Sequence, residues 1–259
     1  MELDVRSPSK FAGDLLDECL RAFGFRLAPL GWKTEITSGG LTYGYEDLTI
    51  RRYAPWLCDA DFQSVYQVAK HHTLVDVCRC YELWDLVKEM QRVEGDVVEI
   101  GVWRGGTGAI IASAAKRWKP SATVHLCDTF SGVVKAGALD SFYKGGEHAD
   151  TSVDLVASLL QKLNLGNCHI LKGVFPDETA GKIGDCKISF CHIDVDVYES
   201  ARLAVEWLVP RMEPGAFLVF DDYGFISCRG VTTLVNEMRN DGLWRFIYNI
   251  NGHAILTRK

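Results

Sequence analysis

The sequence lacks the features that would place it in a membrane or on a nucleic acid. No run approaches the ~20 consecutive apolar residues that a membrane-spanning helix needs. The formal net charge is -6, and no basic tract is present to neutralise phosphates. The first residues, MELDVRSPSK, lack a basic segment followed by an apolar one, which is the pattern of a secretory leader. We therefore expect a cytoplasmic protein that binds neither a membrane nor a nucleic acid.

The sequence also lacks a recognised zinc pattern, although it contains nine cysteines. Cys78-Arg79-Cys80, close to His71 and His72, could be considered as a metal site, but its spacing is not one that zinc sites use. The preferred interpretation is a helix with buried or half-buried thiols. In a cytoplasmic protein, these thiols are expected to be mostly reduced.

The chain changes character near Gly95, so we predict an N-terminal extension, 1–94, ahead of the main domain. Within it, residues 9–27 and 60–93 place apolar side chains three and four apart, which predicts helices. Residues 28–56 carry several glycine, proline and aromatic residues, which predicts irregular structure with a short hairpin. We expect this helical extension to contribute to a lid.

Strands and helices alternate regularly in the main domain, residues 95–259, which predicts an α/β fold with a parallel sheet. The predicted strands are 97–102, 123–128, 168–173, 187–194 and 216–222, and the predicted helices are 107–118, 151–163, 198–209 and 229–240. Two β-rich runs around Asn251-Gly252 predict a tight C-terminal hairpin, which must add one antiparallel strand. This is the layout of the class I methyltransferase Rossmann-like fold, with a seven-stranded, mostly parallel sheet.

The segment EIGVWRGGTG follows the first strand of this domain and opens a helix. Gly101, Gly105 and Gly106 allow the backbone to pass close to a ligand, and free N–H groups at the helix start suit an anion. The spacing G-x-x-x-G-G does not match the dinucleotide fingerprint, and the lysine of a P-loop is absent. A nicotinamide dehydrogenase is therefore disfavoured.

Two acidic residues flank this glycine loop. Glu99 lies inside an apolar strand, where an unpaired carboxylate is costly, so we expect it to meet the ammonium group of a ligand. Asp128 ends the next strand, where an acidic residue can accept hydrogen bonds from ribose hydroxyls. The alternatives are a salt bridge for Glu99 and a helix cap for Asp128.

Two acidic pairs, Asp194-Val-Asp196 and Asp221-Asp222, lie at the ends of the fourth and fifth predicted strands, each before a helix. Four converging carboxylates repel one another unless a cation or shared protons offset their charge. Oxygen ligands suit Mg²⁺, so we expect Asp194, Asp221 and Asp222 to bind it, which leaves Asp196 as the general base. His192 lies on the same face of its strand as Asp194, and a hydrogen-bonded core histidine is the preferred interpretation.

At this point the sequence resembles the macrocin O-methyltransferase family, which methylates sugars in the biosynthesis of macrolide and aminocoumarin antibiotics. The resemblance lies in the stretches GDVVEIGVWRGGTG (95–108), CDTFSGV (127–133), LKGVFPDE (171–178), HIDVDVYES (192–200) and EPGAFLVFDDYG (213–224). It implies S-adenosylmethionine as the methyl donor and Mg²⁺ as the metal. The chain departs from the family at Val195, where the family has glycine.

The resemblance also implies roles for individual residues. Cofactor contacts map to Glu99, Gly101, Trp103, Gly105, Thr107, Asp128, Gly173 and Phe175. The metal ligands map to Asp194, Asp221 and Asp222, and the catalytic base maps within Asp194-Val-Asp196, with the two aspartates not separated. Tyr198 is expected to border the active site.

The leading hypothesis is a Mg²⁺-dependent O-methyltransferase that acts on a sugar hydroxyl of a small-molecule glycosylated natural product. Loop 131–150 and segment 28–56 would then form a lid that excludes water. Methylation of a catechol or another phenol is an alternative, and so is a binding or assembly protein that kept the fold without turnover. The aromatic residues of segment 23–66 suggest either a homo-oligomer interface or this lid.

Overall fold

The computed structural model describes residues 33–38, 41–46 and 53–259. The chain divides into one unit that ends at Tyr53 and a second that spans Ala54–Lys259. In the first unit, β1 (Lys33–Ser38) and β2 (Leu41–Glu46) form an antiparallel hairpin. A hairpin was predicted in this region, whereas the predicted helix 9–27 lies outside the described residues.

The second unit begins well before Gly95, where the sequence pattern placed the boundary. Two helices, α2 (Ala60–Ala69) and α3 (Val77–Glu89), occupy the predicted helical stretch 60–93. Each begins at an aspartate, Asp59 or Asp76, whose carboxylate accepts a hydrogen bond from the first turn. Both helices pack on α4 (Gly106–Trp118), so they belong to the same compact unit as the sheet.

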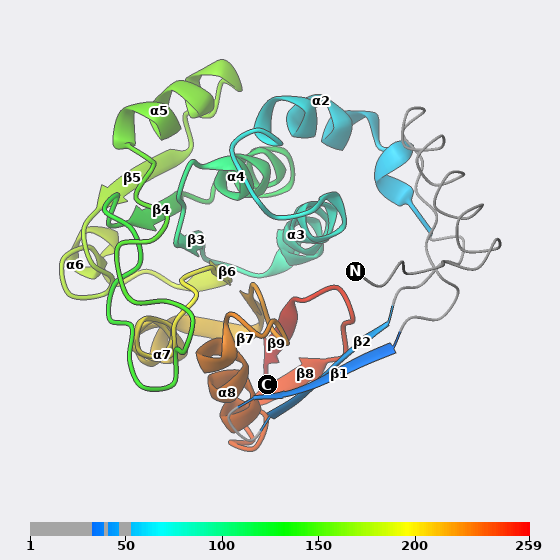
Figure 1. Ribbon diagram of the computed structural model, residues 1–259. Helices are drawn as coiled ribbons and strands as arrows, with labels where there is room; N and C mark the ends of the chain where they lie inside the picture. The colour runs from blue at the N-terminus through cyan, green and yellow to red at the C-terminus, as the bar shows by residue number, and fades with distance from the viewer. Residues whose placement is uncertain (1–32, 39–40, 47–52) are drawn as a thin grey trace, which may run out of the picture. The chain divides into compact units, whose positions relative to one another are not determined.

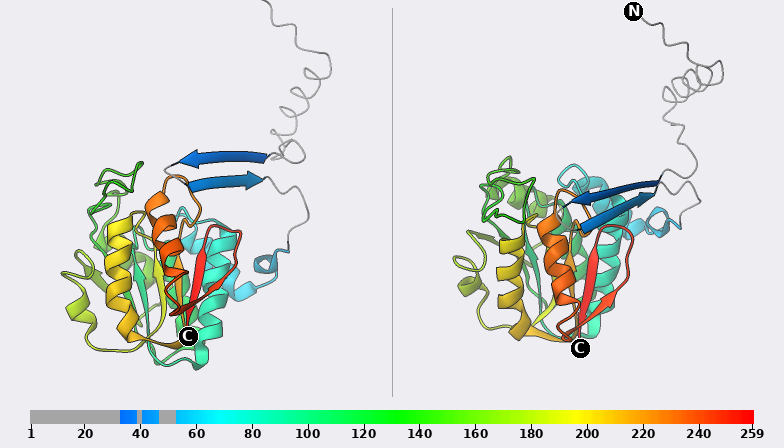
Figure 2. Two further views of the ribbon diagram at one scale, coloured as in Figure 1. Left: turned by 90° about the horizontal axis from the view of Figure 1, so that it is seen from below. Right: turned by 60° about the horizontal axis from the view of Figure 1, so that its bottom comes forward.

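A seven-stranded sheet forms the centre of this unit, with strand order β5-β4-β3-β6-β7-β9-β8 (Figures 1 and 2). Its strands are β3 (Asp96–Ile100), β4 (Val124–Asp128), β5 (Cys168–Lys172), β6 (Ile188–Ile193), β7 (Met212–Phe220), β8 (Trp244–Ile247) and β9 (Ala254–Arg258). Neighbouring strands from β5 to β7 pair in parallel, and β9 pairs antiparallel with both β7 and β8. The predicted sheet with one antiparallel strand is confirmed.

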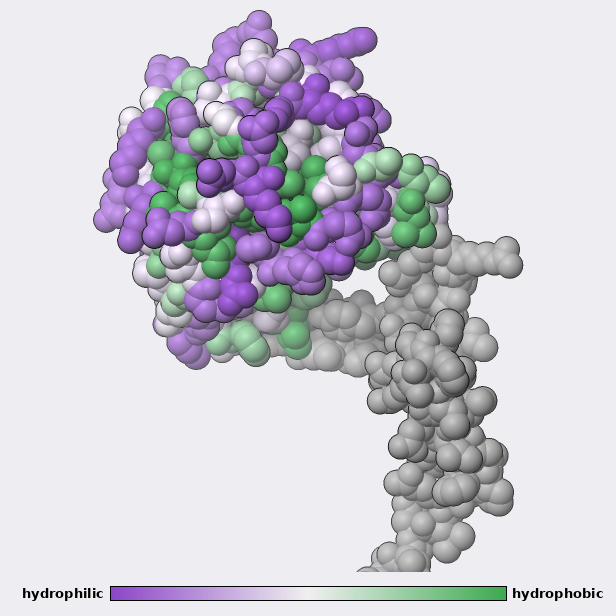
Figure 3. All heavy atoms as spheres, turned by 90° about the horizontal axis from the view of Figure 1, so that it is seen from above, coloured by the Kyte–Doolittle hydropathy of each residue, from purple (hydrophilic) through white to green (hydrophobic). Residues whose placement is uncertain are grey.

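Helices cover both faces of the sheet (Figure 2). One face is covered by α2, α3, α4 and α5 (Val153–Lys162), and the other by α6 (Ala180–Ile183), α7 (Tyr198–Leu208) and α8 (Arg229–Met238). Each layer buries its own hydrophobic core against the sheet, as expected when parallel strands are covered on both sides. Figure 3 views the side of α2 and α5, where hydrophilic side chains dominate and hydrophobic ones lie in the hollows between them.

Alternation along the strands places a row of polar side chains beneath α3 and α4. Val97 of β3, Phe190 of β6, Val219 of β7 and Ile255 of β9 all contribute to the core on that face. Side chains two positions apart on a strand share a face, so the residues two positions after Val97, Phe190 and Val219 also lie on it. The residue two positions before Ile255 does so too. These are Glu99, His192, Asp221 and His253, all of them buried.

The C-terminal hairpin differs from the predicted tight turn. Residues 248–253 connect β8 to β9, and only Gly252 of the Asn-Gly pair has a positive φ, +93°. The longer connection delivers His253 into the core, where its Nδ1 lies 2.6 Å from Glu82 of α3. Within the described residues, no helix is both long and apolar enough to cross a membrane.

Candidate active site

A cavity that opens to solvent lies at the carboxyl ends of β3, β4, β6 and β7. Its empty volume, with the opening included, is about 1090 Å³. This is the edge of the sheet where ligands bind in open α/β folds, at the point where the strand order reverses between β3 and β6. Most of the predicted site residues line it, namely Gly101, Trp103, Thr107, Asp128, Gly173, Phe175, Asp194, Asp196, Asp221 and Asp222. Glu99 and Gly105 do not belong to this lining.

The glycines of the first loop serve the packing of the backbone as well as the cavity. Gly101 has φ +89°, and a Cβ there would lie 1.8 Å from the carbonyl oxygen of Asp194. Gly105 begins α4 in a left-handed conformation, with φ +88°. The sequence suggested free N–H groups at the helix start, but the Gly106 N–H donates to the carbonyl of His72 at 3.0 Å. This N–H is therefore not available to an anion.

Glu99 has a protein partner, His192, on one of its two carboxylate oxygens. It is fully buried, and its Oε1 lies 3.0 Å from Nδ1 of His192 on the neighbouring strand. Burial raises the pKa of Glu99, and the hydrogen bond with His192 opposes this rise. A ligand contact at Glu99 stays a prediction: α4 lies over the carboxylate, because a Cβ on Gly108 would lie 2.5 Å from Oε2.

Asp128 holds the glycine loop in place. Its Oδ2 accepts hydrogen bonds from the backbone N–H groups of Val102 and Trp103 at 2.7 and 2.8 Å. Its Oδ1 accepts from Phe130 N at 2.6 Å. Asp128 also lines the cavity, so this structural role is compatible with the predicted contact to a ribose.

Three of the four clustered carboxylates converge as predicted for metal binding. One oxygen each from Asp194, Asp221 and Asp222 lies within 4.8 Å of the others. Burial and repulsion from Asp221 raise the pKa of Asp194 well above its usual range. No hydrogen bond to the Asp194 carboxylate is found among the described residues.

Asp221 and Asp222 have basic partners that the sequence patterns did not reveal. Arg79 Nη1 donates to Asp221 Oδ1 at 2.7 Å and to Asp222 Oδ1 at 3.0 Å. His253 Nε2 lies 3.0 Å from Asp221 Oδ1. Burial acts to raise the pKa of Asp221, but the hydrogen bond with His253 and the charge of Arg79 outweigh it and lower that pKa. For Asp222, burial and repulsion from Asp221 raise the pKa.

Asp196 lies apart from the basic partners and has a different neighbour. Tyr143, from the loop after β4, makes a side-chain hydrogen bond with Asp196, and Cys228 Sγ lies 3.5 Å from Oδ1. Asp196 and Asp222 both have positive φ, 64° and 58°, which is uncommon for residues other than glycine. Burial raises the pKa of Asp196, and the hydrogen bond with Tyr143 opposes this rise.

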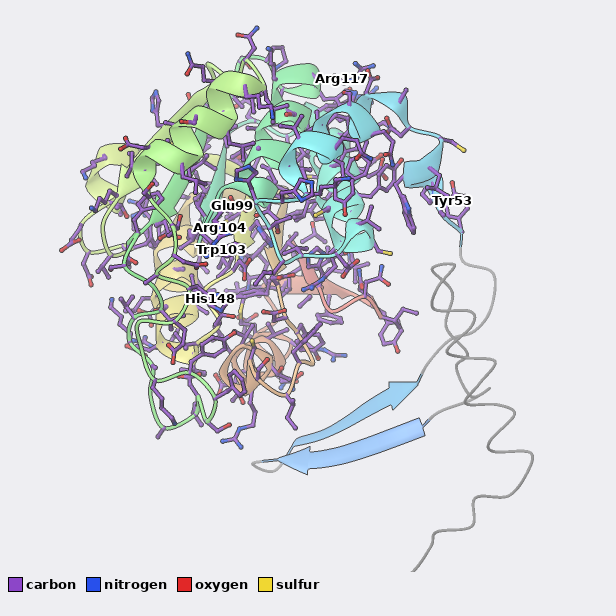
Figure 4. All side chains as sticks on the ribbon, turned by 45° about the horizontal axis from the view of Figure 1, so that its top comes forward. Tyr53, Glu99, Trp103, Arg104, Arg117 and His148 are labelled. Carbon is purple, nitrogen blue, oxygen red and sulfur yellow. The ribbon has the colours of Figure 1, made fainter. Side chains whose placement is uncertain are left out.

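The loop after β4 is tied to the rest of the unit at several places. Asp150 accepts a hydrogen bond from Trp103 Nε1 at 2.8 Å and pairs with Arg104, whose guanidinium lies 4.6 Å from the Trp103 ring centroid. Figure 4 shows Trp103 and Arg104 between Glu99 and His148 of the loop. Asp140 is buried and accepts from Tyr198 N at 3.0 Å, at the start of α7. These ties hold the loop against the cavity.

The structure also bears on smaller interpretations of the sequence. Tyr198 does not line the cavity, because its hydroxyl donates to Glu237 of α8 at 2.8 Å. His192 is a buried, hydrogen-bonded core residue, which is the preferred interpretation of the sequence.

The segment Cys78-Arg79-Cys80 was considered as a metal site. Its arginine, rather than its thiols, lines the cavity and contacts Asp221 and Asp222. Val195, where the family has glycine, lines the cavity.

The donor set fits a hard divalent cation. Three carboxylates converge, and Asp194 has no hydrogen-bond partner among the described residues. Together with Asp196 the cluster carries up to four negative charges, which Arg79 and His253 offset only in part. Such oxygen donors are those that Mg²⁺ prefers.

The family model of macrocin-O-methyltransferase (TylF) matches residues 66–259, which include the cavity and the acidic cluster. The chain belongs to the macrocin-O-methyltransferase family. It is therefore an O-methyltransferase, and the resemblance seen in the sequence is confirmed.

Two relatives with named activities are similar to this chain over most of their length. It is 29% identical over 214 residues to an 8-demethyl-8-(2,3-dimethoxy-alpha-L-rhamnosyl)-tetracenomycin-C 4'-O-methyltransferase of Streptomyces olivaceus, covering 74% of this chain and 80% of the relative. It is 28% identical to the mycinamicin III 3''-O-methyltransferase of Micromonospora griseorubida, covering 73% and 78%. Both names describe methyl transfer to oxygen.

Solved structures confirm the class I methyltransferase fold. The O-methyltransferase NovP superposes with a TM-score of 0.62 at 24% identity, covering 73% of this chain and 82% of that chain. An O-methyltransferase from Bacillus cereus in complex with SAH gives a TM-score of 0.53 at 16% identity, covering 82% and 94%. At these identities the likeness concerns the fold alone.

Proposed function

We propose that this protein transfers the methyl group of S-adenosylmethionine to a hydroxyl of a sugar carried by a small-molecule natural product, and that Mg²⁺ assists the reaction. The observation that carries the proposal is the convergence of Asp194, Asp196, Asp221 and Asp222 on one cavity at the strand ends. The tetracenomycin relative supports the acceptor class, because its name describes O-methylation of a compound that carries a rhamnosyl group.

The cofactor would occupy the part of the cavity next to β3 and β4. Gly101, Trp103 and Thr107 line it from the first loop and the start of α4, and Asp128 faces it from the end of β4. Gly173 and Phe175 line it from the segment after β5. These residues are the ones proposed to bind S-adenosylmethionine, whereas Glu99 and Gly105 support them from outside the cavity.

Asp194, Asp221 and Asp222 are proposed to hold Mg²⁺, and Asp196 is proposed to accept the proton of the acceptor hydroxyl at a carboxylate oxygen. S-adenosylmethionine would supply an activated methyl group, and Mg²⁺ would lower the pKa of the hydroxyl as a Lewis acid. Tyr143 orients Asp196 through their hydrogen bond. The loop that carries Tyr143 limits the access of water because Asp140 and Asp150 hold it against the site.

A methyl-transfer screen tests this function directly. The full chain is incubated with labelled S-adenosylmethionine and either glycosylated acceptors or catechols, with MgCl₂ or with EDTA. We expect label in a glycosylated product only when Mg²⁺ is present. Full activity in EDTA would refute the metal role, and transfer to catechols alone would refute the sugar as acceptor.

A further inference from the structure

Arg79 places a fixed positive charge on two of the proposed metal ligands. Its Nη1 lies 2.7 Å from Asp221 Oδ1 and 3.0 Å from Asp222 Oδ1. The Arg79 side chain is only 8% exposed, so water and salt screen this charge weakly. The Arg79 guanidinium therefore already pairs with two of the carboxylates that are proposed to bind Mg²⁺.

The start of α3 holds the Arg79 guanidinium in this position. Asp76 caps the helix, with Oδ1 accepting from Cys78 N at 2.8 Å and from Arg79 N at 3.2 Å. The other oxygen, Oδ2, accepts from Arg79 Nε at 2.9 Å. The Phe225 ring lies 5.1 Å from the guanidinium carbon. Because Asp76, Asp221, Asp222 and Phe225 all contact its guanidinium, Arg79 is held in one position, unlike a mobile surface arginine.

The contacts of Arg79 leave other oxygens of the cluster available. Arg79 uses Oδ1 of Asp221 and Oδ1 of Asp222, while Asp222 Oδ2 meets the weak donor Cys228 Sγ at 3.4 Å. Asp194 has no hydrogen-bond partner among the described residues. Arg79 and a divalent ion would therefore neutralise the same carboxylates without sharing every oxygen.

We propose that Arg79 is a positioning residue that neutralises part of the charge of Asp221 and Asp222 and thereby weakens the binding of the divalent ion. The inference rests on the Mg²⁺ site of the proposed function. Two cations that serve the same carboxylates repel each other, and each also lowers the charge available to the other. Arg79 thus keeps the acidic cluster stable without the ion and keeps the ion exchangeable.

Removing this charge has two linked consequences. The protein without metal should lose stability, because the carboxylates repel one another more strongly. Mg²⁺ should bind more tightly, on the order of tenfold, because a nearby unit charge repels a divalent ion appreciably even where the dielectric constant is high. An arginine with only a structural role would lower stability equally with and without Mg²⁺.

The test compares full-length wild type, Arg79→Gln and Arg79→Lys by thermal melting in EDTA and across an MgCl₂ titration. For Arg79→Gln we expect a lower melting temperature in EDTA, and a rise in melting temperature that begins at an MgCl₂ concentration about tenfold lower than for wild type. Arg79→Lys keeps the charge, so the MgCl₂ concentration at which its melting temperature begins to rise should stay close to that of wild type. Arg104→Gln is the matched control, since it removes the same charge from an arginine that pairs with Asp150 outside the cluster.

The proposal is overturned if the melting temperature of Arg79→Gln begins to rise at the same MgCl₂ concentration as for wild type, or at a higher one. If this variant unfolds in EDTA, its recovery by MgCl₂ supports the proposal, and failure to recover at any concentration overturns it. Asp221→Asn separates the two levels of inference. If Mg²⁺ stabilises wild type and not Asp221→Asn, the metal site holds whatever Arg79 does. If Mg²⁺ stabilises neither protein, both the metal site and the role of Arg79 are wrong.

Discussion

Four aspartates end two neighbouring strands, yet each has a different environment. Asp221 is paired with Arg79 and His253, Asp222 shares Arg79, and Asp194 has no hydrogen-bond partner among the described residues. Asp196 instead meets Tyr143. Because opposite charge favours ionisation and burial without a partner opposes it, these environments give chemically similar groups different proton affinities. This difference in environment supports the proposal that Asp196 is the base while the other three aspartates bind the metal.

Asp196→Asn should lower kcat about 10²–10⁴-fold, the usual contribution of a general base. Tyr143→Phe should lower kcat by about tenfold, because it removes one hydrogen bond to a charged group. Stabilisation of each variant by S-adenosylhomocysteine in thermal melting should match wild type. Unchanged kcat in Asp196→Asn would shift the role of base to Asp194.

Glu99→Gln should change how stability depends on pH. Burial raises the folded-state pKa of Glu99 above its value in the unfolded chain, so its contribution to stability is fully present below the unfolded pKa and is lost as pH rises through the folded pKa. Glutamine lacks this loss, so the variant should gain stability relative to wild type as pH rises above the unfolded pKa of a glutamate, by roughly a few °C in melting temperature. Glu94→Gln, which removes the same charge from an 83% exposed side chain, is the control and should show no such trend.

At the scale of elements, the site depends on how closely strand ends and loops approach one another. β3 and β6 are neighbours at the switch point, and the turn after β3 passes the backbone of Asp194. The helix α3 reaches across the ends of β7 and β9, with Arg79 and Glu82 one turn apart and bound to Asp221 and His253. The loop after β4 is anchored at the start of α7 by Asp140.

Gly101→Ala should destabilise the protein by more than about 3 kcal/mol, because the new Cβ would overlap the carbonyl oxygen of Asp194. Gly146→Ala is the matched control. It has nearly the same φ, +90°, but no atom lies within 4 Å of the position that its new Cβ would take, so only the backbone strain of about 1 kcal/mol remains. Urea unfolding of both variants measures the difference, and equal losses would contradict the steric explanation.

Asp140→Ala should loosen the loop that carries Tyr143. Its carboxylate accepts hydrogen bonds from Tyr198 N and Gly137 N at 3.0 and 2.9 Å, and their loss should cost about 1–2 kcal/mol. We expect faster proteolysis within residues 131–151 and a higher KM for the acceptor. Asp177→Ala removes an exposed pair between Asp177 and Lys135 of the same loop, and should have little effect.

At the scale of the whole molecule, the cavity is assembled within the unit Ala54–Lys259, from segments far apart in the sequence. The connection between α2 and α3, the glycine loop, the segment after β5 and the ends of β6 and β7 all line it. The family model covers most of this unit. A ligand that fills the cavity therefore joins several elements and should stabilise the fold as one unit.

S-adenosylhomocysteine at about 100 times its dissociation constant should raise the melting temperature by roughly 5–10 °C. NAD should have no effect, because the glycine loop lacks the dinucleotide spacing and α4 begins with an N–H already bonded to His72. Stabilisation by NAD alone would contradict the assignment of the cavity to S-adenosylmethionine.

The sequence by itself determined the α/β class, the order of strands and helices in 95–259 and the placement of the four clustered aspartates at the cavity. These features depend on local periodicity and on the rule that parallel strands end at one edge of the sheet. The tertiary structure decided the partners: Glu99 pairs with His192, Asp128 binds the glycine loop, and Arg79 binds Asp221 and Asp222. Residues 79 and 221 are far apart in the chain, and their contact depends on where α3 packs across the sheet, which no local pattern encodes.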